Sequence, residues 1–189
     1  MVSKVKIGLA VRAGVEKKPG MSVRRIVQYP EEVLRLRARR VEHIDDRIRD
    51  LVRDMAETMY AAPGLGLAAP QVGESLQVMV IDVSQQDEDP QKNLITVVNP
   101  ELVSAEGEVD SKEGCLSVVD ITCEIKRHSR VCLRGMSLEG APLEMDADGL
   151  LAIVVQHELD HLNGTLIIDR LRGLKRDLMK RRLRKRTGH

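Results

Sequence analysis

The chain has 189 residues, of which 42% are hydrophobic and 31% charged, and its formal net charge is +1 at pH 7. This length suits a single domain, and because Phe and Trp are absent the core must be built mainly from Leu, Ile, Val, Met and Ala. No apolar run reaches the roughly 18 residues of a membrane span. Three unevenly spaced cysteines without a secretory signal argue against a disulfide framework and for a reducing cytoplasm.

The first half of the chain predicts one helix followed by strands. Apolar residues recur at helical spacing from Ile44 to about Ala61, which predicts an amphipathic helix that ends before Pro63 and Gly64. The apolar run LQVMVIDV that follows predicts a buried strand, QQDEDPQKN an exposed loop, and NLITVVNPELV a second strand.

The second half predicts a hairpin meander between two helices. Residues 122–145 alternate apolar and polar positions and contain the turn signal LEGAP. A mostly apolar helix follows, and Ile167, Leu171, Leu174 and Leu178 recur at helical spacing and predict a last helix. Because strands cluster between helices, we expect an α+β fold: antiparallel or mixed β-sheets around a central helix, in a single domain with a C-terminal helix.

The segment IVVQHELDHLNG places His157 and His161 four residues apart, with Glu158 directly after the first. Positions four apart share one face of a helix, so both imidazoles can reach one metal ion while the carboxylate stands beside it. The preceding run GLLAIVV is apolar and predicts a buried helix, in which histidines and carboxylates need partners. The pattern therefore predicts the metal site of a hydrolase.

A hydrolytic metal site needs a third protein ligand and one open position. The histidine of metzincin-type proteases would fall at Ile167, and the downstream glutamate of thermolysin-type proteases is absent from Leu162 to His189. The third ligand is therefore expected upstream, as an Asp, a Glu or a cysteine. Cys115 stands out because it follows a glycine in EGCLS, whereas Cys123 and Cys132 lie in strand-like runs where a buried thiol is common.

Three segments together resemble the motifs of bacterial-type peptide deformylases: GLGLAAPQ (residues 64–71), EGCLS (113–117) and QHELDH (156–161), in the family's order. The resemblance runs from about Met21 to the basic C-terminus. It implies a deformylase domain over residues 21–189, and we assign no function to the extension formed by residues 1–20. Members of the family are cytoplasmic hydrolases that remove the N-formyl group from the initiator methionine of nascent proteins and release formate.

The resemblance also implies a cofactor and its ligands. One Fe(II) ion per chain is expected, with zinc, nickel or cobalt able to replace it. The implied ligands are Cys115, His157 and His161, which leave one position of a tetrahedral site for water. Glu158 would accept the proton of that water and hand it to the departing amine. The Gln71 side-chain amide and the Leu116 backbone N–H would stabilise the developing oxyanion.

The same resemblance places the peptide substrate along the first motif, where backbone groups near Gly66 would pair with it like an added strand. The residues expected to contact substrate are Gly64, Leu65, Gly66, Gly114, Leu150, Ile153 and Val154. After EGCLS, the run VVDITCEIKR departs from the proline found there in many members. Arg127, at the end of this run, aligns with an arginine that pairs with a glutamate of the second motif, so we expect an Arg127–Glu113 pair.

Two other classes of protein fit these residues less well. A metallopeptidase is disfavoured mainly by the missing downstream ligand. A non-catalytic metal-binding module would have four protein ligands, whereas Glu158 beside an open position favours catalysis.

The C-terminal segment RLRGLKRDLMKRRLRKRTGH, Arg170 to His189, is strongly basic. It holds ten Lys or Arg and one Asp, a formal charge of +9, while the rest of the chain carries 20 basic and 28 acidic residues, or −8. Its leucines are expected to pack on the domain and leave the basic face outward. Because the substrate emerges from a ribosome, we expect this tail to bind ribosomal RNA. We further expect a monomer that does not associate with membranes.

Overall fold

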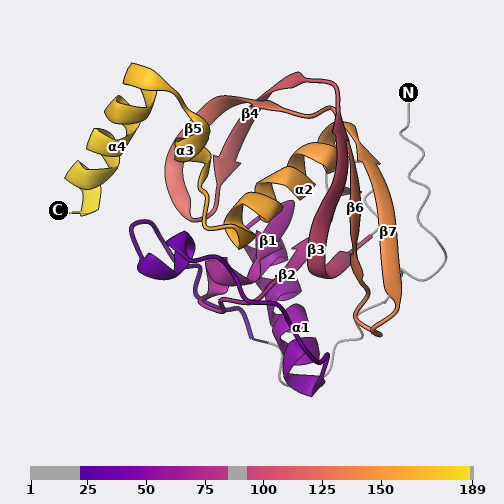
Figure 1. The fold of residues 1–189 in the computed structure, drawn as a ribbon. Coiled ribbons are helices and arrows are strands. Elements are labelled where there is room, and N and C mark those ends of the chain that lie inside the picture. Colours follow the sequence, from indigo (N-terminus) through magenta and orange to yellow (C-terminus); the bar gives the residue numbers. More distant parts are fainter. Residues whose placement is uncertain (1–21, 85–92, 188–189) are drawn as a thin grey trace.

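The structure, a computed structural model, describes residues 22–84 and 93–187 (Figure 1). The extension assigned to residues 1–20 and nearly all of the expected loop at 85–93 lie outside the described residues. Every helix in the described ranges is too short or too polar to cross a membrane.

The fold is α+β, as expected, and its strands form two antiparallel sheets. The elements are η1 (Glu32–Arg35), α1 (Asp46–Ala61), β1 (Gly66–Ala68), η2 (Ala69–Val72), β2 (Val78–Ile81), β3 (Ile95–Glu106), β4 (Val109–Cys115), β5 (Val118–Arg127), β6 (Arg130–Met136), β7 (Pro142–Asp148), α2 (Gly149–Leu162), α3 (Ile167–Arg170) and α4 (Gly173–Thr187). One sheet has the order β1-β2-β3-β6-β7, and the other is the ribbon β4-β5.

Helix α2 occupies the centre of the domain, between the five-stranded sheet and the β4–β5 ribbon (Figure 1). Its apolar residues, including Leu151, Ala152 and Val155, are buried against residues of the sheet such as Met79 and Leu133. The helix is apolar on most of its surface because it is covered on both sides. This burial places the histidine-bearing turns inside the protein.

Helix α1 confirms the first predicted helix and begins two residues later than expected. The reason is Asp45, which is not helical and whose side chain accepts a hydrogen bond from the Ile48 backbone N–H at 3.0 Å. The apolar face of α1 packs with β1 and β2 through Leu51, Met55 and Met59.

The hairpin meander expected over residues 122–145 is partly wrong. β6 and β7 do form an antiparallel hairpin across the expected turn. β5, however, pairs with β4, a strand that the sequence did not predict, and not with β6. Alternation along a strand reports which side chains face the core but does not report which strand lies beside it.

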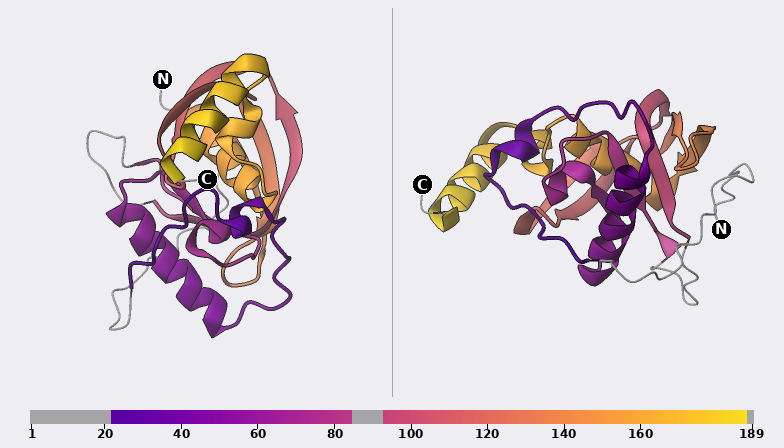
Figure 2. Two further views of the ribbon diagram at one scale, coloured as in Figure 1. Left: turned by 90° about the vertical axis from the view of Figure 1, so that its left-hand side faces the viewer. Right: turned by 90° about the horizontal axis from the view of Figure 1, so that it is seen from below.

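The single last helix is also wrong, since the structure has a short α3 and a separate α4, which extends from one end of the domain (Figures 1 and 2). Leu171 is extended between them, and Gly173 has a positive φ of 55°. The break turns Leu174 and Leu178 to solvent, where they are 74% and 54% exposed. α4 packs instead through Leu183, which is buried with residues of β5 and α3.

Candidate metal centre and active site

Helix α2 positions His157, Glu158 and His161 in its last two turns, and all three are largely shielded from solvent. The helix ends at Leu162 with Asn163 as its C-cap residue, and Gly164 then reverses the chain with φ of 71°. A Cβ at Gly164 would overlap the carbonyl oxygen of Arg35, so this position needs glycine both for its backbone angle and for space. The sharp exit keeps the following segment close to the domain.

Cys115 is the last residue of β4, in the β4–β5 ribbon. Its side chain lies close to the two histidines of α2. Its Sγ lies 3.2 Å from Nε2 of His161. The ligand atoms of Cys115, His157 and His161 all lie within 4.8 Å of one another, close enough to share one metal ion. The three residues that the resemblance gave as ligands are thus brought together from two parts of the chain.

A carboxylate fixes the orientation of His157. Its Nδ1 lies 2.9 Å from Oε2 of Glu113, which leaves Nε2 for a metal. Arg127 donates to both oxygens of Glu113, from Nε and Nη2, each at 2.9 Å. The expected Arg127–Glu113 pair is confirmed. Burial alone would raise the pKa of Glu113, but the hydrogen bonds from Arg127 and His157 outweigh it and lower that pKa to about 2.

The two imidazoles differ electrostatically. Burial would lower the pKa of His157, but its hydrogen bonds with Cys115 and Glu113 outweigh burial and raise that pKa well above the ordinary value. Burial and the nearby His157 lower the pKa of His161 well below it. Burial is also the main cause that raises the pKa of Glu158 to about 7.

The donor set fits a transition metal. One thiol and two imidazoles are ligands that zinc and iron accept, and three protein ligands leave a coordination position open. Two buried polar atoms at the site, Nδ1 of His161 and Oε2 of Glu158, have no hydrogen-bond partner within the described part of the chain. Unsatisfied buried atoms are rare, and the free Glu158 oxygen beside the candidate ligands is consistent with another species at this site.

Gln71 and Leu116 flank the same centre. The Gln71 Oε1 accepts a hydrogen bond from the Ala68 backbone N–H at 2.8 Å, which turns Nε2 toward the site, 4.0 Å from the Cys115 Sγ. The Leu116 carbonyl accepts a hydrogen bond from Nε2 of Gln28 at 2.9 Å, which holds the peptide after Cys115 in place.

A pocket of about 530 Å³ opens on this centre. Its lining includes Cys115, His157, Glu158, Gln71 and Leu116. All seven residues expected to contact substrate also line it: Gly64, Leu65, Gly66, Gly114, Leu150, Ile153 and Val154. Residues 118–122, the first half of the run that departs from the family pattern, form part of its wall. The pocket combines an apolar surface with a few polar groups, as sites for small ligands do.

The strand β1 borders this pocket through Gly66. It is the first strand of its sheet and pairs on one side with β2. Within the described residues no strand pairs with its other edge, an arrangement that peptide recognition by strand addition uses in other proteins.

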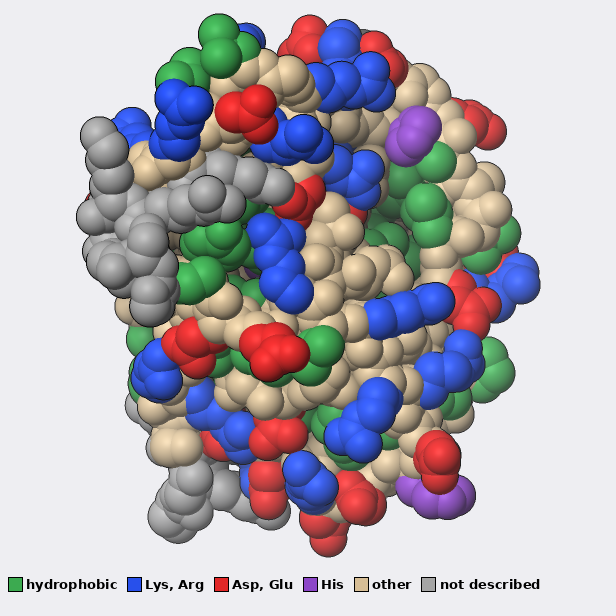
Figure 3. All heavy atoms as spheres, turned by 60° about the vertical axis from the view of Figure 1, so that its left-hand side comes forward, with side chains coloured by type: hydrophobic (Ala, Val, Ile, Leu, Met, Phe, Trp, Pro, Cys, Tyr) green, Lys and Arg blue, Asp and Glu red, His purple; other side chains and the backbone are tan. Residues whose placement is uncertain are grey.

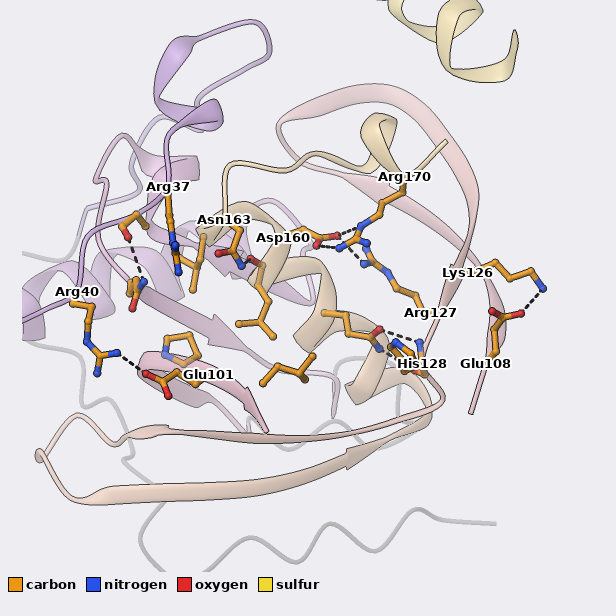
Figure 4. A pocket seen from close by; sticks show the side chains of 17 residues that line it. Arg37, Arg40, Glu101, Glu108, Lys126, Arg127, His128, Asp160, Asn163 and Arg170 are labelled. Carbon is orange, nitrogen blue, oxygen red and sulfur yellow. Dashed lines mark hydrogen bonds and ion pairs between the residues drawn. The ribbon is translucent and has the colours of Figure 1, made fainter. Parts of the chain in front are cut away.

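A larger cavity of about 960 Å³ lies on the other side of α2 and is lined by charged residues from several elements (Figure 4). It contains none of Cys115, His157 and His161. Size therefore does not identify the active site here, and the chemistry of the lining does.

An α+β fold with a central H-E-x-x-H helix, and a cysteine whose sulfur lies near both histidines, is typical of the class of metal-dependent hydrolases. The family model for polypeptide deformylase matches residues 23–177. The chain is 47% identical over 165 residues to the peptide deformylase of Syntrophobacter fumaroxidans, covering 87% of this chain and 96% of that protein. The chain thus belongs to the polypeptide deformylase family.

Solved structures of peptide deformylases have the same fold as this chain. The crystal structure of the Ehrlichia chaffeensis peptide deformylase in complex with actinonin has a TM-score of 0.80 and 38% identity, covering 88% of this chain and 98% of that one. The Met-Ala-Ser-bound class I type b enzyme from Acinetobacter baumannii has a TM-score of 0.73 and 32% identity, covering 79% of this chain and 98% of that one. The chain is accordingly a metal-dependent hydrolase that removes the N-formyl group from nascent peptides.

Sequence reasoning missed two polar residues near the site. Asp160 lies between the two histidines in sequence but on another face of α2, where it accepts a hydrogen bond from Arg127 at 2.7 Å. Ser117 is fully buried, and its Oγ lies 3.4 Å from the Gln71 Nε2. From the sequence alone, an acid between these two histidines could be a third metal ligand or a partner for arginine, and only the fold separates these roles.

Gly66 provides a test of this packing. A Cβ there would lie 2.5 Å from Oε1 of Glu158 and 2.8 Å from Cγ1 of Val154. Gly66→Ala should therefore lower the free energy of unfolding by about 1–3 kcal/mol, as overpacking does, measured by urea denaturation. Gly114→Ala is the matched control, because a Cβ there meets no atom within 4 Å. A Gly66 variant as stable as the Gly114 variant would contradict the described packing.

Proposed function

We propose that deformylation takes place in the 530 Å³ pocket, on a single Fe(II) ion held by Cys115, His157 and His161. The observation that carries the proposal is the approach of these three ligand atoms to within 4.8 Å of one another, beside the buried carboxylate of Glu158. Iron follows from the family resemblance, and zinc, nickel or cobalt can replace it because all accept imidazole and thiolate ligands.

A divalent metal in this position supplies Lewis-acid chemistry, which polarises the formyl carbonyl and activates water for attack. Glu158 is the residue that moves the proton. It is 3% exposed, and burial raises its pKa to about 7, a value at which a carboxyl both accepts and releases a proton near neutrality. It takes one proton from the attacking water and delivers it to the amide nitrogen as the C–N bond breaks, so that formate and a free amine leave.

Gln71 and Leu116 would stabilise the negative charge that develops on the formyl oxygen. The Gln71 amide is held with its N–H groups toward the site, because its oxygen is already used by the Ala68 N–H. The Leu116 backbone N–H is the second donor in this proposal. Donors that are oriented before the reaction stabilise the transition state without reorganising during it.

The peptide substrate is proposed to lie along β1, with its backbone paired to groups near Gly66 and its methionine side chain in the apolar part of the pocket. Leu65, Leu150, Ile153 and Val154 supply that apolar surface, while Gly64, Gly66 and Gly114 leave room for the backbone. The bound Met-Ala-Ser of the Acinetobacter baumannii relative supports a site for a peptide that begins with methionine.

We propose that the functional unit is a cytoplasmic monomer formed by residues 21–189. Residues 1–20 have no part in the proposed reaction, since every residue assigned to it lies between Gly64 and His161.

The role of Glu158 can be tested by its removal. Glu158→Ala should keep its metal, because Glu158 is not a ligand, and should lose on the order of 10²-fold or more in turnover of formyl-Met-Ala. Formate release and metal content are the two measurements. Glu124→Ala, which removes an exposed carboxylate from β5, should leave both unchanged. Normal turnover by the Glu158 variant would contradict the assigned mechanism.

The basic tail is proposed to bind ribosomal RNA. Figure 3 faces the side of the molecule that carries α4 and shows basic and acidic side chains interspersed over this face. The basic tail, residues 170–189, differs from this mixed surface because its formal charge is +9. On α4, Lys175, Arg176, Arg181 and Arg182 are exposed, so their charges are available to phosphates.

Replacing these four α4 residues with Gln should weaken ribosome co-sedimentation and reduce its dependence on salt. The slope of log K against log salt should become shallower by about 0.7–0.9 for each RNA phosphate that the tail no longer neutralises. Hydrolysis of formyl-Met-Ala should not change, because the buried Leu183 that anchors the helix is kept. The matched control replaces four exposed arginines elsewhere, namely Arg37, Arg39, Arg47 and Arg130. Equal loss of ribosome binding in both sets would rule out a specific role for the tail.

A further inference from the structure

A continuous chain of ionic contacts runs from the segment before α4 to the metal site. Arg170, the last residue of α3, donates from Nε to Oδ2 of Asp160 at 3.0 Å and from Nη2 to Oδ1. Arg127 donates from Nη1 to Oδ2 of Asp160 at 2.7 Å and, on its other side, to both oxygens of Glu113. Glu113 in turn contacts Nδ1 of His157 at 2.9 Å. Figure 4 shows the side chains of Arg170 and Arg127 converging on Asp160 at the charged cavity.

The inner part of this chain is buried and its outer end is not. The side chains of Arg127, Glu113 and Asp160 are 3%, 7% and 10% exposed, whereas that of Arg170 is 48% exposed. Two carboxylates therefore share the single buried guanidinium of Arg127. Arg170 supplies the second positive charge, so the four groups balance as two acids and two bases.

This balance determines how Arg127 is held. Its guanidinium is planar and rigid, so the direction in which Nη1 points fixes where Nε and Nη2 point. Without Arg170, both oxygens of Asp160 would depend on Arg127 for a positive partner. The electrostatic attraction between Arg127 and Asp160 would then be stronger, and the guanidinium would move away from Glu113. Glu113 would be held less firmly, and so would the His157 ring that it orients.

We propose that Arg170 and Asp160 are positioning residues for His157, acting through Arg127 and Glu113. The proposal rests on the proposed role of His157 as a metal ligand. It links the start of the basic C-terminal segment to the geometry of the metal site. The competing interpretation is that the Arg170–Asp160 ion pair only holds α3 against α2 and stabilises the fold.

A neighbouring ion pair separates the two interpretations. Arg35 donates to Asp169, the residue beside Arg170, in a pair whose side chains are 31% and 27% exposed. Arg35→Met therefore removes an ion pair that holds α3, while every described contact between Arg170 and His157 is kept. It is the matched control for Arg170→Met.

The probe is Co(II) bound to the full-length protein, since its visible absorption reports ligand geometry independently of turnover. Glu113→Gln removes the direct partner of His157 and should raise the Co(II) dissociation rate about 10- to 100-fold. Arg170→Met should change the absorption bands in the same direction and raise the rate about 3- to 10-fold, as expected for coupling through a packed network. Arg170→Lys, which keeps the charge but not the paired contact, should fall between Arg170→Met and the unchanged protein.

Activity should change in a distinctive way. Arg170→Met should lower kcat for formyl-Met-Ala and leave KM within about twofold, because Arg170, Asp160 and Arg127 do not line the substrate pocket. Arg35→Met should lower the melting temperature without changing the Co(II) spectrum, the dissociation rate or kcat.

A double-mutant cycle tests whether Arg170 affects the Co(II) site through Glu113. If Arg170 acts through Glu113, then Arg170→Met should alter the Co(II) dissociation rate less than about twofold in the Glu113→Gln background. Additive effects, or an Arg170→Met variant that loses stability with an unchanged Co(II) spectrum, would overturn the proposal. If His157→Ala retained the Co(II) spectrum of the unchanged protein, the proposed function itself would fail, which is a separate outcome.

Discussion

The buried guanidinium of Arg127 joins the two halves of the active site. It comes from the end of β5 and contacts Glu113 on β4 and Asp160 on α2. The β4–β5 ribbon is a separate sheet, so this interaction is a direct polar link between the strand that ends at Cys115 and the helix that carries both histidines. Breaking one partner of such a buried network leaves an uncompensated charge, which is why it constrains the site so strongly.

The same arrangement explains why the two cavities differ in chemistry. His157 and Glu158 of α2 line the smaller pocket, whereas Asp160 of the same helix lines the larger cavity (Figure 4). Helical spacing separates the two acids, because Asp160, two positions after Glu158, points to nearly the opposite side of the helix. One helix thus carries the candidate metal ligands and an ion-paired acid within five residues, His157 to His161.

The sequence predicted the parts of this protein that depend on local patterns. The apolar periodicity of α1, the strands β2 and β3 and the α+β class follow from spacing along the chain. β1 was missed because it has only three residues, and β4 because its sequence VDSKEGC has no apolar run. The break between α3 and α4 was missed because Leu174 and Leu178 keep the helical spacing, although they face solvent.

The site was predictable to the extent that its groups lie in short motifs. The three motifs contain the candidate metal ligands, Glu158, Gln71 and Leu116, and the Arg127–Glu113 pair followed from the resemblance. The contacts of Asp160 with Arg127 and Arg170 join residues 33 and 10 positions apart, and no local pattern signals them. Long-range pairing of this kind depends on how β5 and α3 pack around α2.

The central claim is that Cys115 is a metal ligand together with two histidines, and X-ray absorption at the metal edge tests it most directly. The zinc-loaded protein should show one sulfur at about 2.3 Å and two nitrogens at about 2.0–2.1 Å. Sulfur scattering should disappear in Cys115→Ser and remain in Cys123→Ser, because Cys123 is a buried core residue of β5. A site without sulfur in the unchanged protein, or sulfur that persists in Cys115→Ser, would contradict this account.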